Sequence, residues 1–535
     1  MLTPIKKKHL LLVLFILWTK QHVYSQTIGL VHHTTEVSDG YILFTPSFNN
    51  KVYLINNCGE TVNEWTFNEQ PGLTCYLLEN GNLLRAGKNY LETRDWDNNI
   101  VWSFDMETAG YKQHHDIEPL PNGNILCILN DIYSSSEMVS AGKDPSFVNN
   151  QVKIDKIIEL QPIGNNNAVI VWEWKFMDHL IQDYDNTKLN FGNIIDHPEL
   201  IDLNFNDLSS DITHVNGIDY NSSLDQIILS ARHMNELYII DHSTTTWEAA
   251  SHSGGNANKG GDILWRWGNP RAYKQGTTLN QKLFLQHDAK WIETGYTDEG
   301  KISVFNNDGD GSAAFSSVHI LTPDIVNNIY QKENNIFKPS SFEWSWQGSI
   351  LGSIVDEGRK SGAHSLPNGN FIITETSAGR ISEIKKDGTL IWSYVNPTGA
   401  GTNIYNQFVT PTSDNNLFRG EKYPSNYIGF SGKNLSPSGI IENQNSTSTS
   451  CINSLTIDEI ELKTIKIKNP SEHNIIQFNK IVNLDSVTII DLNGKIVSEH
   501  LNLKSDHITA TLEPSIYFLK LKKKNTVQYL KILIN

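Results

Sequence analysis

Histidine recurs in four short segments that supply the residues best suited to chemistry. The segments are His114-His115-Asp116, His214-Val215-Asn216, Gln286-His287-Asp288 and Ala363-His364-Ser365. Arg232 adds a fixed cation at the end of the apolar run that follows His214. Imidazole can act as a nucleophile, a proton carrier or a metal ligand, and the planar guanidinium binds tetrahedral oxyanions through a rigid donor fork. A histidine cluster alone would suit a metal site, but Arg232 inside it disfavours a bound cation and favours transfer of an oxyanionic group.

A repeated tryptophan pattern predicts the elements that position these histidines. Six apolar runs each end in a tryptophan with a second aromatic residue two positions later: Trp65-Thr66-Phe67, Trp102-Ser103-Phe104, Trp172-Glu173-Trp174, Trp265-Arg266-Trp267, Trp344-Ser345-Trp346 and Trp392-Ser393-Tyr394. Asn-Gly turns between alternating apolar runs, as at Asn80-Gly81 and Asn122-Gly123, are strong hairpin signals. These repeats predict an all-β fold with a six-bladed β-propeller, and seven blades are the alternative count.

Equivalent positions of a propeller converge in space. The innermost strand of each blade starts near one end of the central channel, so residues at the same corner of successive repeats meet there. The histidines that share this corner are His115, His214, His287 and His364. The middle repeats are too long for four strands alone, and we expect their insertions, residues 182–206 and 242–281, to form the rim of a binding site.

Composition and the N-terminus exclude several classes of protein. The chain has 535 residues, enough for more than one domain, and its net charge of −16 argues against binding to nucleic acid. Residues 1–25 have the features of a signal peptide: Lys6-Lys7-Lys8, an apolar stretch ending near Trp18, and small residues before Gln26. No later apolar run is long enough to span a bilayer, so we expect an exported chain without a membrane span in its mature form.

The C-terminal part differs in composition from the repeats. Residues 26–430 are assigned to the propeller, and residues 431–456, rich in Ser, Asn, Thr and Gly, are predicted to be a linker. Residues 457–535 alternate in polarity like a small β-sandwich. Their motifs resemble the C-terminal sorting domain of Bacteroidota type IX secretion: Asn469-Pro470, Asp491-Leu492-Asn493-Gly494-Lys495 and Ser515-Ile516-Tyr517-Phe518. This resemblance implies passage through the periplasm to the cell surface or medium, with the type IX secretion machinery as a partner.

The four cysteines fit no zinc motif. They are Cys58, Cys75, Cys127 and Cys451. In an exported protein one disulfide among the first three is expected, with Cys58–Cys75 favoured, and buried free thiols are the alternative.

The histidine segments belong to a longer series that resembles the arylsulfate sulfotransferase family over about residues 40–400. The series is His114-His115-Asp116, His214-Val215-Asn216, Ser230-Ala231-Arg232-His233, Trp265-Arg266-Trp267-Gly268, Gln286-His287-Asp288-Ala289 and Phe305-Asn306-Asn307. The resemblance implies a six-bladed propeller that moves a sulfuryl group from an aryl sulfate to a phenol without a nucleotide donor. No metal or cofactor is expected.

The resemblance also assigns roles to residues. It makes His287 the nucleophile, and His115, His214 and Arg232 the groups that bind the sulfate and stabilise the transition state. His114 is an alternative to His115 as the working residue. The predicted substrate-binding residues are His114, Asn216, Asn307 and His364, the last placed by its repeat corner rather than by the resemblance.

The predicted reaction proceeds in two steps. A neutral imidazole attacks sulfur, expels a phenolate and leaves a sulfohistidine, which a second phenol then attacks, so ping-pong kinetics are expected. Activity is expected to fall below a pH of about 6.5, where free imidazole becomes protonated. The alternative function is a non-catalytic secreted propeller that binds a sulfated or glycan ligand, because the fold alone does not separate the two.

Overall fold

The computed structural model describes residues 26–443, 465–471, 475–523 and 526–534. The predicted signal peptide and most of the predicted linker lie outside these residues. Strands dominate, and the few helices are short. Among the described residues, none of the helices combines the length and the apolar character needed to cross a bilayer.

Between residues 26 and 443, six antiparallel sheets of four or five strands account for most of the structure. The first sheet consists of β33 (Leu417–Tyr423), β2 (Tyr41–Pro46), β3 (Lys51–Asn56) and β4 (Thr61–Thr66). The second consists of β5 (Pro71–Leu77), β6 (Leu83–Gly87), β7 (Tyr90–Arg94) and β8 (Ile100–Asp105). The third consists of β9 (Gln113–Pro119), β10 (Ile125–Ser134), β11 (Gln151–Ile163) and β12 (Asn167–Lys175).

The other three sheets follow the same order from inside to outside. The fourth sheet consists of β15 (Val215–Asn221), β16 (Gln226–Ala231), β17 (Glu236–Asp241) and β18 (Trp265–Trp267). The fifth consists of β19 (His287–Trp291), β20 (Ile302–Asn306), β21 (Ser317–Leu321) and β26 (Trp344–Trp346). The sixth consists of β29 (Gly362–Ser365), β30 (Phe371–Glu375), β31 (Arg380–Ile384), β32 (Leu390–Val395) and β1 (Gly29–His33).

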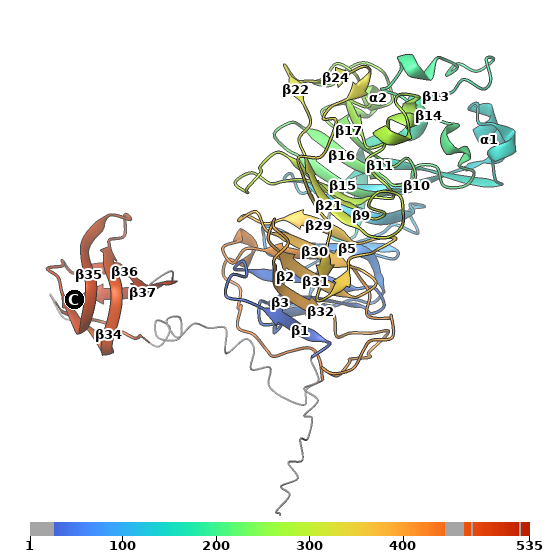
Figure 1. Cartoon of the computed structure of the whole chain (residues 1–535). Coiled ribbons are helices and arrows are strands. Elements are labelled where there is room, and N and C mark those ends of the chain that lie inside the picture. The colour runs from blue at the N-terminus through green and yellow to red at the C-terminus, as the bar shows by residue number, and fades with distance from the viewer. Residues whose placement is uncertain (1–25, 444–464, 472–474, 524–525, 535) are drawn as a thin grey trace, which may run out of the picture.

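The sheets form a ring that the two ends of this region close. The first strand of each sheet contacts the first strand of the next in the order β33, β5, β9, β15, β19 and β29, and the sixth sheet returns to β33 through β30. Strand β33, late in the sequence, pairs with the early β2, and the early β1 pairs with β32. Figure 1 shows the blue strands β1 to β3 beside the orange strands β30 to β32. The fold is thus nearly all β and propeller-like.

The repeated tryptophans lie on the outer strands and link each sheet to the next. One indole N–H from each sheet donates to a backbone carbonyl further along the ring: Trp65 to Asp95, Trp102 to Asn167, Trp174 to Gly261, Trp265 to Lys338, Trp344 to Lys386 and Trp392 to Asn57. A buried indole needs a hydrogen-bond partner for its N–H. Each of these tryptophan side chains therefore fills the space between two sheets and also fixes the distance between them. The last of these bonds joins the sixth sheet to the first.

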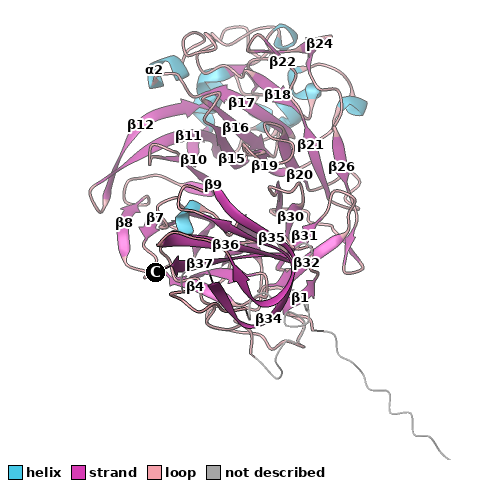
Figure 2. Ribbon diagram, turned by 90° about the vertical axis from the view of Figure 1, so that its left-hand side faces the viewer, coloured by secondary structure: helices cyan, strands magenta, loops and turns pink. Residues whose placement is uncertain are grey.

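Short elements connect the strands of the sheets, and α2, β22 and β24 among them lie near β17 and β18 (Figure 2). These elements are α1 (Ser135–Ser140), α2 (Thr246–Ala249), β13 (Leu180–Ile181), β14 (Ile201–Asp202), β22 (Ile325–Val326), β23 (Ile329–Tyr330), β24 (Lys332–Glu333), β25 (Ile336–Phe337), β27 (Ser349–Ile350) and β28 (Ser353–Ile354), with 3-10 turns at Pro145–Phe147, Phe176–His179, Ile194–Asp196, Phe205–Asp207, Pro270–Tyr273, Thr278–Asn280 and Ile428–Phe430.

The C-terminal residues form a separate sheet with its own core. Its strands are β34 (Ile475–Ile490), β35 (Ile496–Thr509), β36 (Ser515–Lys523) and β37 (Thr526–Ile534), in the order β35-β34-β36-β37. Buried residues alternate with less buried ones along parts of β34 and β36, as expected for a sheet with one covered face.

The prediction of a disulfide between Cys58 and Cys75 is wrong. Cys58 is disulfide-bonded, but Cys75 and Cys127 are buried free thiols. The pairing Cys58–Cys75 is therefore excluded, and the remaining cysteine, Cys451, lies outside the described residues. Both free thiols face strand partners in the core, where burial raises the pKa of each thiol above its ordinary value.

Candidate functional site

Three of the predicted histidines sit at irregularities of the innermost strands. The register of β9 on β10 shifts near His115, that of β15 on β16 shifts next to His214, and that of β19 on β20 shifts at His287. The backbone is left-handed at His115 (φ 57°), at His214 (φ 50°) and at Asp288 (φ 54°). Left-handed non-glycine residues are uncommon, and β-bulges re-aim side chains, often at functional sites. These corners therefore turn their side chains out of the ladder.

The re-aimed imidazoles converge. The ring centre of His115 lies 4.9 Å from that of His214 and 6.4 Å from that of His287. The three residues come from three consecutive sheets and are brought together by the packing of β9, β15 and β19 against one another.

The ring of His287 is held at both nitrogens. Nδ1 lies 2.7 Å from Oδ1 of Asn307, and Nε2 accepts the backbone N–H of Lys360 at 3.2 Å. The amide group of Asn307 donates to the carbonyls of Glu357 (2.6 Å) and Lys360 (2.8 Å), so its oxygen must face His287. Nδ1 therefore carries the proton, and the lone pair of the neutral imidazole is on Nε2.

The surroundings of His287 keep it neutral. Burial is the main cause that holds its pKa well below the ordinary value of 6.5, the charges of Arg232 and Arg419 lower it further, and the bond to Asn307 acts in the opposite direction. Burial likewise holds the pKa of His115 well below 6.5. Desolvation disfavours the charged form of imidazole. The acid limb expected near pH 6.5 for free imidazole is therefore shifted to lower pH.

His115 and His114 form a chain with a buried carboxylate. Nε2 of His114 lies 3.0 Å from Oδ1 of Asp155, and Nδ1 of His114 lies 2.8 Å from Nδ1 of His115. Because the carboxylate accepts the Nε2–H of His114, Nδ1 of His114 accepts the Nδ1–H of His115. Nε2 of His115 is then left with a lone pair. The two histidines that the sequence offered as alternatives thus act as one unit.

His214 has its own orienting carboxylate. Nδ1 of His214 lies 2.7 Å from Oδ2 of Asp211, and the ring stacks on His233 with centres 4.4 Å apart. Nδ1 of His233 lies 2.7 Å from the carbonyl of Asp211. Asp155 also holds this corner, because its Oδ2 accepts the hydroxyl of Thr213 at 2.8 Å. The corner is thus tied to the sheet that carries His115.

Residues 357–361 form the wall facing Nε2 of His287. Lys360 and Ser361 are both left-handed (φ 61° and 69°), and Ser361 is fixed by Thr376 through its N–H (2.9 Å) and its hydroxyl (3.1 Å). Arg232 donates to the carbonyl of Gly358 at 3.4 Å, while its buried Nε has no partner among the described residues. A half-buried guanidinium with spare donors near a nucleophilic nitrogen suits an anionic group.

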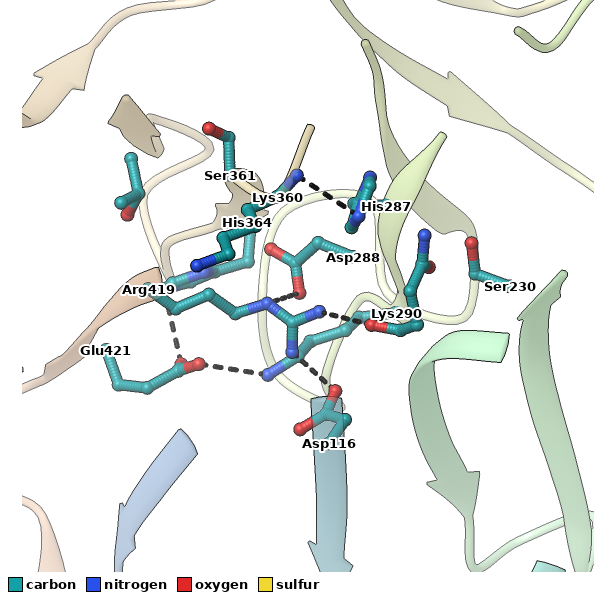
Figure 3. Close-up of polar contacts among 12 residues, drawn as sticks. Asp116, Ser230, His287, Asp288, Lys290, Lys360, Ser361, His364, Arg419 and Glu421 are labelled. Carbon is teal, nitrogen blue, oxygen red and sulfur yellow. Dashed lines mark hydrogen bonds and ion pairs between the residues drawn. The ribbon is translucent and has the colours of Figure 1, made fainter. Parts of the chain in front are cut away.

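Arg419 contacts residues at all three histidine corners, and Figure 3 shows its contacts with Asp116 and Asp288. Its guanidinium is ion-paired with Asp116, lies 3.0 Å from Oδ1 of Asp288 through Nε, and donates to the carbonyl of Asn216 at 3.2 Å. Asp116 and Asp288 directly follow two of the site histidines in the sequence, and Asn216 lies two positions after the third. Asp116 also accepts the hydroxyl of Tyr76 at 2.8 Å. One buried cation on β33 therefore fixes the backbone behind all three imidazoles.

The remaining predicted residues have other partners. Nε2 of His364 lies 3.5 Å from Oε2 of Glu421, and the other carboxylate oxygen, Oε1, accepts from Nζ of Lys290 at 3.2 Å (Figure 3). Asn216 donates to the carbonyl of Gln286 at 2.7 Å and so ties β15 to the start of β19. In the part of the chain that the structure describes, neither side chain hydrogen-bonds to the ring of His287.

Sequence reasoning missed Asp155, Asp211 and Arg419. Asp155 lies inside the long strand β11, and Arg419 follows the last tryptophan repeat, where no further strand was assigned to the ring. Asp211 alone offered a signal, because a carboxylate three residues before a candidate histidine can reach its ring. The other two are recognisable only when the sheets are assembled.

Comparison with known families agrees with this geometry. The sequence profile described as Arylsulfotransferase (ASST) matches residues 76–397, which include the three bulged histidine corners. The chain belongs to the arylsulfotransferase family. Membership supports aryl sulfotransferase function in general, with small aryl sulfates and phenols as substrates. Arg419 lies beyond the matched residues. No curated protein matches the chain.

Solved structures resemble the ring of sheets at low identity. They include the β-propeller domain of Cps50 (Swd1) from Myceliophteria thermophila (9% identity, 70% of this chain and 92% of that chain, TM-score 0.36). A protein of unknown function from Bacteroides caccae (14%, 67% and 94%, 0.36) and virginiamycin B lyase from Staphylococcus aureus (10%, 69% and 90%, 0.32) are similar too. These likenesses concern the fold alone.

Proposed function

We propose that this arylsulfotransferase moves a sulfuryl group from a phenolic sulfate ester to a phenol through a sulfohistidine at Nε2 of His287. The observation that carries the proposal is the tautomer of His287: Asn307 takes the Nδ1–H, so the lone pair lies on Nε2 in a buried, neutral ring. A neutral imidazole with a fixed lone pair is a competent nucleophile.

In the first half-reaction, Nε2 forms a bond to sulfur while the bond from sulfur to the aryl oxygen breaks. The phenolate leaves with the electron pair of that bond. The positive charge that develops on the ring is shared with the Nδ1–H bond to Asn307, which strengthens as that proton becomes more acidic. Arg232 and the backbone N–H of Lys360, which faces Nε2 in the free protein, stabilise the oxygens of the transferring group.

In the second half-reaction, the acceptor phenol attacks sulfur and the N–S bond breaks, returning its electron pair to Nε2 of His287. Nε2 of His115 takes the phenol proton. His115 can pass its Nδ1 proton to His114, whose charge then lies beside Asp155. A neutral His115 with its lone pair on Nε2 suits a general base. The proton finally neutralises the first phenolate, so the cycle balances.

The direct test is continuous release of a coloured phenol from its sulfate ester, with and without a second phenol, for wild type and His287→Ala. Release that requires the second phenol and is lost in the variant supports sulfohistidine transfer. Release without an acceptor would indicate a sulfatase instead. Absence of turnover with retained binding of aryl sulfate would favour the non-catalytic binding propeller.

The two half-reactions separate the role of His115. In a rapid-mixing experiment the burst of phenol reports the first transfer, and the steady state reports the second. We expect His115→Gln to slow transfer to acceptors of high pKa more than transfer to acidic phenols that are already ionised. An equal loss for all acceptors would contradict the base role.

We further propose that the six sheets are the blades of a six-bladed propeller within residues 26–430, and that residues 1–25 and 457–535 direct export and type IX sorting, with 431–456 as linker. The ring of sheets and the separate C-terminal sheet are compatible with this division. Deleting residues 457–535 in a type IX-secreting bacterium should remove the activity from the medium and cell surface. Unchanged secretion would overturn the sorting assignment.

A further inference from the structure

Two histidines and an aspartate meet where the third sheet contacts the insertion of the fourth. His179 closes the 3-10 turn after β12, and His252 and Asp262 belong to the insertion between β17 and β18. Oδ1 of Asp262 lies 3.0 Å from Nδ1 of His179 and 2.7 Å from Nδ1 of His252. The three potential ligand atoms all lie within 4.8 Å of one another.

The hydrogen bonds of His179 leave Nδ1 without a proton in the neutral ring. Nε2 lies 2.8 Å from the carbonyl of Ala249, which can only accept, so Nε2 carries the N–H. Nδ1 of a neutral ring then presents a lone pair to the carboxylate of Asp262. Two acceptors face each other at 3.0 Å in a site where His179 is fully buried. A cation between them is required, either a second proton on the ring or a metal ion.

The surroundings match those of a histidine metal ligand. Such a histidine usually donates its other ring N–H to a carbonyl or carboxylate, as His179 does to Ala249. The ring is also fixed by stacking on Trp174, with centres 5.4 Å apart and an angle of 9°. The indole of Trp174 donates to the carbonyl of Gly261, next to Asp262. Ligand orientation is therefore set by the protein rather than by an ion.

We propose that His179 Nδ1, His252 Nδ1 and a carboxylate oxygen of Asp262 bind one divalent transition-metal ion, with zinc the best fit to this donor set. Two imidazoles and a carboxylate suit Zn²⁺, and solvent reaches the cluster at His252, whose side chain is 63% exposed. The ion would clamp the insertion between β17 and β18 to the turn after β12. This site is separate from the His287 cluster and does not depend on the proposed reaction.

The test is zinc binding by the full chain after removal of metal with a chelator. Isothermal titration with Zn²⁺ and elemental analysis should find one ion per chain in the wild type. His252→Ala should weaken the affinity by at least about 100-fold, and its exposed side chain makes loss of folding unexpected. Added zinc should raise the melting temperature of the wild type and not that of the variant.

Two control variants separate this site from other histidines. His197→Ala removes a histidine of similar exposure that lies 2.9 Å from Glu199 and belongs to no three-ligand group among the described residues, and it should leave zinc binding unchanged. His233→Ala tests the second group with ligand-like spacing, formed with Asp211 and His214, and should also keep the bound ion. Equal zinc binding in wild type and His252→Ala, or no binding in either, would overturn the proposal and leave a protonated His179 as the required cation.

Discussion

The corner of β29 and the corner of β19 occupy the same place in two repeats, yet they differ in what their histidines do. His287 starts a strand with a register shift, and its ring meets His115 and Asn307. His364 lies in a strand whose pairing with β30 is regular, and its ring lies beside Glu421. A bulge and a left-handed residue thus decide which histidines face the reaction centre. The repeat position alone does not.

The two corners also differ in the charge of their ionisable groups. At the reaction centre, burial and the nearby guanidinium charge of Arg419 lower the pKa of His115 and His287 and so favour the neutral form of both rings. Beside His364, Lys290 and Glu421 form a partly buried ion pair, and against the effect of burial the charge of Lys290 lowers the pKa of Glu421 to about 2. The neutral rings are suited to nucleophilic chemistry, whereas the Lys290–Glu421 pair holds the structure beside them.

The largest effect is expected from His287→Ala. Removing the nucleophile should lower acceptor-dependent turnover by roughly 10⁴-fold or more, because both half-reactions pass through its nitrogen. The loss is measured with a chromogenic aryl sulfate, and circular dichroism checks that the variant folds. Turnover within tenfold of wild type would contradict the assignment.

Arg419→Lys should have the next largest effect. The charge is retained but the fork that holds Asp116, Asp288 and the carbonyl of Asn216 is lost, and a misplacement of about 1 Å can cost roughly 10²-fold in rate. The matched control is Arg380→Lys, which loses a two-point pair with Glu375 at 2.6 Å in the sixth sheet.

Both arginine variants should lose stability, since each breaks a buried pair. Only Arg419→Lys should change the rate per folded molecule and the pH profile, because only that guanidinium lies behind the site histidines. Equal rate losses in the two variants would reduce Arg419 to a general stabilising residue.

Changes of pH are expected to have smaller effects on kcat/KM and on the free energy of unfolding, and the direction of each can be stated. Because burial lowers the pKa of His287 and His115 below 6.5, both stay neutral and kcat/KM should stay level from pH 8 to below 6.5. Below 6.5 the unfolded chain binds protons on these residues that the folded chain does not, so the free energy of unfolding should decrease there. Activity and thermal melting measured from pH 8 to 5 check both statements, and an activity midpoint at 6.5 would contradict the first.

The smallest effect is expected from His364→Gln. A residue that faces Glu421 rather than the transferring group supplies no transition-state interaction, so turnover should remain within roughly threefold of wild type. The same chromogenic assay measures it. A loss comparable to that of His115→Gln would show that the fourth corner also reaches the substrate and would remove the contrast drawn here.

Much of the fold could be read from local patterns. Tryptophan pairs and Asn-Gly turns predicted the repeats, because a strand and a tight turn depend on neighbouring residues. The disulfide could not be predicted, because four cysteines permit several pairings and their spacing in the sequence does not choose among them. Arg419 was missed because a strand that closes a ring pairs with residues far away in sequence.

The sequence by itself determined the all-β class, the identity of His115, His214, His287 and Arg232, and the family they indicate. Only the tertiary structure decided which nitrogen of His287 carries the lone pair, how His114 supports His115, and that His364 faces elsewhere. The physical reason is that side-chain types are local information. Tautomer, neutrality and direction depend on burial and on partners such as Asn307 and Asp155, which long-range packing alone brings into contact.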